Sequence, residues 1–116
     1  MSGVMGRPTL HRQDVAVGVG RSQSFGFRWY RDDGQEKTLV DVRAGTATVR
    51  FESLTGEVWK EFSARIFNDS LIQIELDPSS LAGPEWASRS TGVWHLRVTL
   101  DDITTQVVSG YLYLSH

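Results

Sequence analysis

The chain has 116 residues, a formal net charge of −2, 40% hydrophobic residues and no cysteine. This length fits one domain, and the composition is typical of a folded globular chain rather than a disordered one. The lack of cysteine excludes disulfides, thiolate metal sites and thiol nucleophiles, and the near-neutral charge argues against a nucleic-acid partner.

Residues 1–13 are polar, contain glycine and proline, and show no hydrophobic period, so we interpret them as an extended N-terminal arm. They lack the apolar run of a signal peptide, and no stretch of the chain is long enough for a membrane helix. We therefore expect a soluble product made in the cytoplasm, with no membrane partner. Unpatterned termini are usually mobile. We favour the alternative that the arm docks on a neighbouring subunit through Val4, Met5, Arg7, Leu10 and Arg12.

From residue 14 onward, apolar residues alternate with polar ones, as in the run from Phe25 to Trp29 and the run from Trp94 to Leu100. A period of two places one set of side chains in a core and the other toward water. No segment shows a sustained helical stripe. The pattern predicts strands near residues 14–19, 24–30, 39–42, 46–53, 57–66, 71–76, 93–100 and 105–114.

The breaks between these runs contain residues that favour turns. Because most connections are short, we expect sequential strands to pair antiparallel. The longest connection spans residues 77–92, where Pro78 ends a strand and Ser79 or Ser80 can cap a short helical turn. The short breaks are Asp32–Gly34, Thr55–Gly56, Asn68–Ser70 and Asp101–Asp102.

These elements predict an all-β domain over residues 14–116, most simply an antiparallel β-sandwich of seven or eight strands. A small closed barrel is the alternative, because alternation alone does not distinguish the two architectures.

We find no residues arranged for catalysis, cofactor binding or metal binding. His11, His95 and His116 have no metal-ligating neighbour at a useful spacing, and we expect His95 to be a solvated side chain on the outer face of its strand. The paired aspartates lie in turns, where carboxylates bond to nearby backbone amides. We therefore expect a protein that is not an enzyme and carries no cofactor.

The four tryptophans fall into two groups. Trp29 and Trp94 share the parity of core residues in their strands. Trp59 has the opposite parity, which predicts either an exposed interface residue or a bulge that shifts its register. For Trp86, in the long connection, we favour a plug at the open end of the sandwich, with an interface as the alternative.

Several motifs follow one another in a characteristic order. An aromatic run at Gln23–Phe27 is followed by an Asp-Gly turn, a strand at Ala47–Phe51 and the step Thr55–Trp59. Next come Ile72, Ile74 and Leu76 in one strand, a serine-rich turn, and the pair Gly92–Leu96 and Val108–Leu112. Over roughly residues 14–115 the chain resembles the immunoglobulin-like β-sandwich domains of tailed-phage virion proteins. It is similar to the N-terminal domains of baseplate upper proteins and to short minor tail proteins, particularly those of actinobacterial phages.

The resemblance implies a non-enzymatic structural protein of a virion, present in several symmetric copies and bound to other virion structural proteins. Binding would use strand edges, the outer sheet face with Trp59, and the arm. We expect a minor tail or baseplate component. A capsid decoration or minor capsid protein is one alternative, and a host-glycan-binding module with Tyr30, Trp59 and Trp86 as a stacking platform is another.

Overall fold

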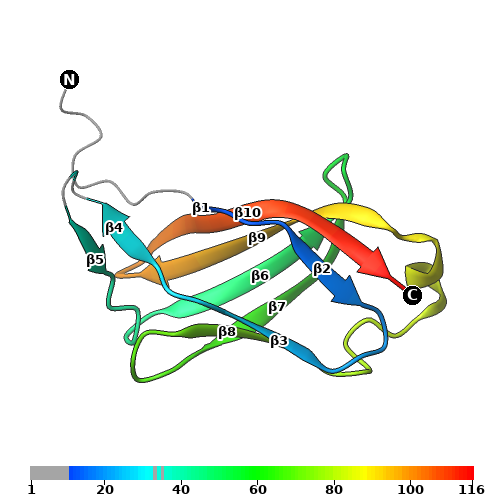
Figure 1. Ribbon diagram of the computed structural model, residues 1–116, viewed down its shortest axis with the longest axis horizontal. Helices are drawn as coiled ribbons and strands as arrows, with labels where there is room; N and C mark the ends of the chain where they lie inside the picture. The colour runs from blue at the N-terminus through cyan, green and yellow to red at the C-terminus, as the bar shows by residue number, and fades with distance from the viewer. Residues whose placement is uncertain (1–10, 33, 35) are drawn as a thin grey trace.

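The fold is all-β, as the alternation predicts, and a computed structural model describes residues 11–32, 34 and 36–116 (Figure 1). The arm residues Val4, Met5, Arg7 and Leu10 lie outside this part. The one helical element among the described residues is a 3-10 turn, η1 (Pro84–Ser88). The strands are β1 (His11–Arg12), β2 (Val15–Gly18), β3 (Gln23–Phe27), β4 (Tyr30–Asp32), β5 (Lys37–Leu39), β6 (Thr46–Glu52), β7 (Val58–Ile66), β8 (Ile72–Leu76), β9 (Thr91–Leu100) and β10 (Ile103–Ser115).

The main sheet has eight strands in the order β1-β10-β9-β6-β7-β8-β3, with β2 also paired to β10, while β4 and β5 form a separate hairpin. Sequential strands joined by short turns are antiparallel, as predicted, in β4–β5, β6–β7, β7–β8 and β9–β10. The prediction of a wholly antiparallel domain is wrong at the N-terminus. There β1 and β2 run parallel to β10, because they pair with the last strand rather than with β3.

The sheet folds over on itself around one core. β7 pairs with β6 along most of its length and with β8 only at Arg65 and Ile66, so the sheet turns at this strand. As a result β3 and β8 lie across the core from β9, where the rings of Phe27 and Trp94 are 5.3 Å apart. Within the described residues no ladder joins β3 to β10, so the barrel alternative is not closed there.

Two predicted strands differ from the observed ones. The predicted strand at 24–30 is interrupted after Phe27, because Trp29 turns into the core and its carbonyl accepts a hydrogen bond from the Val40 amide (2.8 Å). The predicted strand at 39–42 is displaced to 37–39. At residues 41–43 the chain instead forms a turn, in which the Asp41 carboxylate accepts a hydrogen bond from the Arg43 amide (3.0 Å). Val42 is buried in this turn.

The tight turns form where the sequence predicts them. Gly56 (φ 96°) closes the β6–β7 turn, in which the Ser53 amide donates to the Glu57 carbonyl. Asp101 and Asp102 both adopt positive φ between β9 and β10, a conformation that aspartate tolerates better than most residues. These short turns fix the register of the strands that form the outer sheet face.

Candidate interaction face

The outer face of β7, β6, β9 and β10 presents its side chains in cross-strand rows. Arg50 lies opposite Glu61 on one side and His95 on the other, and His95 lies opposite Ser109. In the next row Glu52 lies between Val58 and Val93, and Val93 is opposite Tyr111. Side chains paired in this way are held at fixed spacing, so the face is a rigid pattern of polar and aromatic groups.

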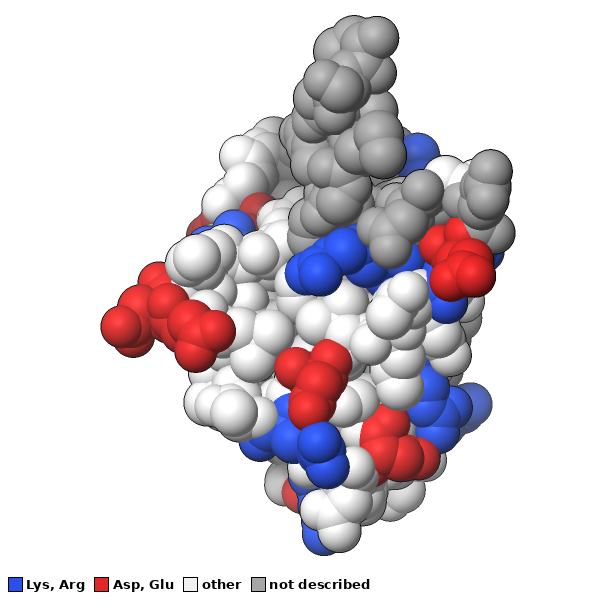
Figure 2. Space-filling model, turned by 90° about the vertical axis from the view of Figure 1, so that its left-hand side faces the viewer, with Lys and Arg blue, Asp and Glu red and all other residues white. Residues whose placement is uncertain are grey.

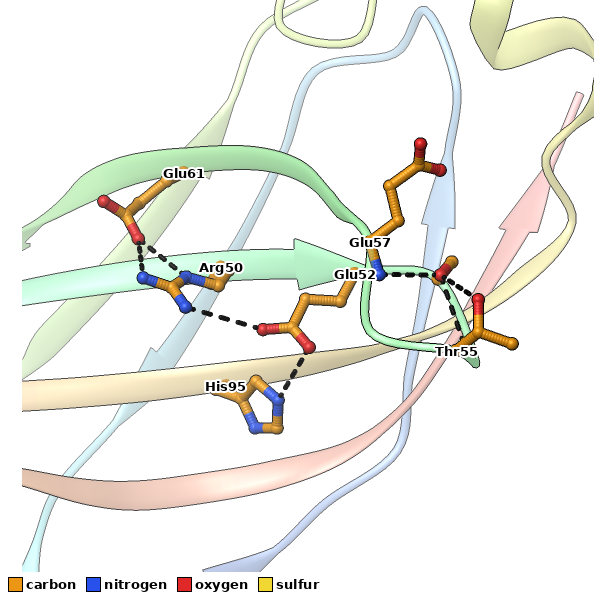
Figure 3. Close-up of polar contacts among 7 residues, drawn as sticks. Arg50, Glu52, Thr55, Glu57, Glu61 and His95 are labelled. Atoms are coloured by element: carbon orange, nitrogen blue, oxygen red, sulfur yellow. Dashed lines mark hydrogen bonds and ion pairs between the residues drawn. The ribbon is translucent and has the colours of Figure 1, made fainter.

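A charged network crosses the middle of this face (Figure 3). The Arg50 guanidinium donates to Glu61 Oε2 through Nε (2.7 Å) and lies 3.8 Å from Glu52 Oε2. The other carboxylate oxygen of Glu52 lies 3.6 Å from His95 Nε2. Only 14% of the Glu52 side chain is exposed, so the arginine compensates a carboxylate that is largely removed from water.

The expectation that His95 is solvated is wrong. Its ring does lie on the outer side of β9, but the side chain is only 19% exposed because Arg50 and Ser109 flank it on the neighbouring strands. His95 Nδ1 is buried and has no hydrogen-bond partner in the described structure.

An exposed aromatic cluster adjoins the network. The rings of Tyr111 (39% exposed) and Tyr113 (45% exposed) lie 6.2 Å apart on β10. The Arg12 guanidinium stacks over Tyr111, 5.1 Å from the ring centroid, and lies 3.8 Å from Asp14. We call Arg12, Asp14, Tyr111 and Tyr113 the tyrosine cluster. Arg12 is one of the arm residues predicted from the sequence, whereas the two tyrosines were not predicted. The core positions of Leu112 and Leu114 nevertheless imply by alternation that both tyrosines point outward.

The chain before β2 is fixed beneath this cluster. The Gln13 amide donates to the Ser109 carbonyl (2.9 Å), and the Gln13 carbonyl accepts the indole N–H of Trp94 (2.7 Å). The Asp14 carboxylate accepts a hydrogen bond from the Tyr111 amide (2.8 Å). Residues 11–13, the last part of the predicted arm, therefore lie along β10, where β1 pairs with Val108 and Ser109.

Trp59 and Trp86 pack against each other, and η1, which carries Trp86, lies at the end of the molecule opposite the β4–β5 hairpin (Figure 1). A bulge in β7 turns Trp59 toward the core, where it is half-buried, as the register-shift alternative predicts. Trp86 in η1 is 4% exposed, the position expected of a plug. Their rings are 5.9 Å apart, and Arg89 stacks against both.

These positions bear on two predictions from the sequence, the use of Trp59 and Trp86 as interface residues and the aromatic platform for sugars. A side chain as buried as Trp86 offers almost no surface to a partner, and Trp59 is covered in part by Arg89. Nor do Tyr30, Trp59 and Trp86 form one stacking platform, because Tyr30 belongs to β4 at the other end of the molecule (Figure 1).

Three turn carboxylates are held in the ionised form. Hydrogen bonds from Arg43 hold the pKa of Asp41 well below its usual range, and Arg28 lowers the pKa of Asp69. The Ser79 hydroxyl and amide lower the pKa of Asp77. All three groups are exposed and stabilise turns.

Charges of both signs are interspersed on the end that carries the β4–β5 hairpin (Figure 2). The described residues contain no group of three or more histidine, aspartate or glutamate side chains able to hold a metal ion. They also include no helix that is long and apolar enough to span a membrane. No model of a known protein family matches the chain, and no curated protein is detectably similar to it.

Proposed function

We propose that this protein is a non-enzymatic structural component of a tailed-phage virion, a minor tail or baseplate protein that binds other virion proteins. The proposal joins the resemblance of residues 14–115 to such domains with one structural observation, the exposed tyrosine cluster on a rigid sheet face. A capsid decoration or minor capsid protein would use the same face. It is distinguished from a tail protein by the position of the chain in the particle.

The tyrosine cluster has the composition of a binding hot spot. Tyrosine and arginine are enriched among the residues that contribute most to protein interfaces, because they bury a large area and lose little side-chain entropy. Tyr111 already contacts both Tyr113 and Arg12 in the free chain. Binding would therefore require little further ordering of these side chains.

The charged network gives this face its specificity. Arg50 and Glu61 present opposite charges at a fixed separation beside the aromatic groups. A partner must match this order of charges to avoid leaving one of them buried and unpaired. In a symmetric particle, several copies of such a contact add up to a strong attachment even when each one is weak.

Incorporation into particles tests the proposal. We expect the double variant Tyr111→Ala/Tyr113→Ala to fold but to be largely lost from purified virions, because it removes the aromatic anchors. Ile103→Ala is the matched control, since Ile103 is on the same strand, is 68% exposed and lies outside the cluster. It should be incorporated normally.

Two results would contradict the proposal. One is normal incorporation of the double tyrosine variant with an unchanged melting temperature. The other is saturable binding of host glycans by the wild-type chain that the tyrosine substitutions abolish, because the cluster would then be a sugar-binding platform.

A further inference from the structure

A cavity of about 380 Å³ opens between the β3–β4 segment and β10, away from the tyrosine cluster. Its volume is at the lower end of the range found for small-molecule sites. The described residues that form its apolar wall are Phe27, Trp29, Ile72, Leu96, Val107 and Val108. They come from both layers of the folded sheet, so the cavity lies where β3 and β10 approach each other without pairing.

A bulge in β10 shapes one side of this cavity. Gln106 is paired with Arg97 and Val108 with Leu96, which leaves Val107 as an extra residue in the strand. Val107 and Val108 are both buried, although alternation would send one of them outward. Two adjacent valines therefore widen the apolar wall at the position where β1 begins to pair with β10.

Cationic groups accompany the apolar wall. Arg28 and Lys37 both line the cavity, and Arg28 is also paired with Asp69 (2.7 Å). No ion pair joins Lys37 to any acidic side chain that the structure describes, and its own side chain is exposed. Lys37 thus places an exposed positive charge at the rim of an apolar space, on β5 opposite Asp32 of β4.

Trp29 adds a polar donor to the wall. Trp29 is more than nine-tenths buried, and its indole Nε1 has no hydrogen-bond partner in the described part of the chain. A buried N–H without an acceptor is uncommon in folded proteins. The cavity therefore combines an aromatic wall, an unused donor and an exposed cation.

We propose that this cavity binds a small amphipathic carboxylate, with an aliphatic or aromatic body inside and its charge beside Lys37. The apolar body would replace water against the valine and tryptophan walls. The carboxylate would stay at the rim, where Lys37 attracts it and solvent still hydrates it. This site is separate from the proposed protein-binding face and stands on different residues.

Titration of the full-length protein with octanoate and with octanol tests this proposal. The four indole N–H resonances in a nitrogen–proton spectrum serve as reporters, with the Trp29 signal assigned from Trp29→Phe. We expect octanoate to shift the Trp29 resonance saturably with one molecule per chain. The resonances of Trp59 and Trp86, at the opposite end of the molecule, should not move. Octanol, which has the same apolar body without the charge, should bind about fivefold more weakly.

Reversing the charge of Lys37 tests whether this side chain itself attracts the carboxylate, as opposed to the net charge of the protein. Lys37→Glu should weaken octanoate about fivefold or more and leave octanol unchanged. Lys60→Glu, the matched control on β7, should change neither. Val108→Phe should weaken both ligands by filling the cavity, with its fold checked by circular dichroism.

The proposal is overturned if octanoate gives no saturable shift of the Trp29 resonance, or if Lys37→Glu and Lys60→Glu bind it equally. An acetylated tripeptide ending in leucine offers the same apolar group and carboxylate on a peptide. Tighter binding of this peptide than of octanoate would assign the cavity to a protein C-terminus and likewise overturn the proposal.

Discussion

The ring of Phe27 lies 5.3 Å from the ring of Trp94, although four steps of the sheet order separate their strands. This contact is possible only because the sheet folds over at β7. Trp94 also donates its indole N–H to the Gln13 carbonyl, 81 residues away in sequence (2.7 Å). One buried side chain therefore joins the two layers of the core to the segment that supports the tyrosine cluster.

The hydrogen bond of Trp94 should be measurable against a second buried indole. Trp94→Phe removes a donor that has an acceptor, whereas Trp29→Phe removes one that has none in the described structure. Both substitutions lose similar volume. We expect Trp94→Phe to lower the free energy of unfolding by about 1 kcal/mol more than Trp29→Phe does. Urea denaturation of the two variants measures the difference, and equal losses would show that the bond contributes nothing.

Gly110 should be required for the close approach of residues 13 and 14 to β10. A Cβ at this position would collide with the Gln13 carbonyl oxygen and come within 2.9 Å of Asp14 Oδ1. We expect Gly110→Ala to destabilise the fold by about 1–3 kcal/mol, since backbone atoms must move apart. Thermal unfolding measures this loss. Ser109→Ala, on the adjacent and partly exposed position, is the control and should change stability little.

Arg50 should matter more to stability than its partner Glu61. Glu61→Ala removes an exposed ion pair and should cost less than about 1 kcal/mol. Arg50→Ala instead leaves the largely buried Glu52 carboxylate without its nearby guanidinium and should cost roughly 1–2 kcal/mol. Denaturant unfolding of both variants tests the order, and a larger loss for Glu61→Ala would refute it.

Alternation predicted most of the fold because the long strands bury the side chains of one face, as in β6, β8 and β9. It placed Trp29 and Trp94 in the core correctly, and it implied the outward tyrosines once Leu112 and Leu114 are assigned to the core. It could not predict that β1 and β2 pair parallel with β10, since pairing between chain ends has no local signal. It also left Trp59 ambiguous, because a single extra residue in β7 reverses the parity of every side chain beyond it.

Stability should fall at acid pH through the turn carboxylates. The pKa values of Asp41, Asp69 and Asp77 are lowered in the folded chain, so their stabilising effect is complete above the ordinary aspartate pKa of about 4. It is lost as the pH falls below that value and each folded-state carboxylate becomes protonated. Melting temperatures from pH 7 to pH 2.5 should decline mainly below pH 4. Asp41→Asn should flatten part of this decline, and an unchanged profile would count against the role of Asp41.

The position of the chain in purified virions tests the central claim most directly. Cryo-electron microscopy of intact particles should show this domain in several symmetric copies on the tail or baseplate. Tyr111, Tyr113 and Arg12 should lie against a neighbouring protein. Particles that lack the chain, or copies whose tyrosine cluster faces solvent throughout, would contradict the account.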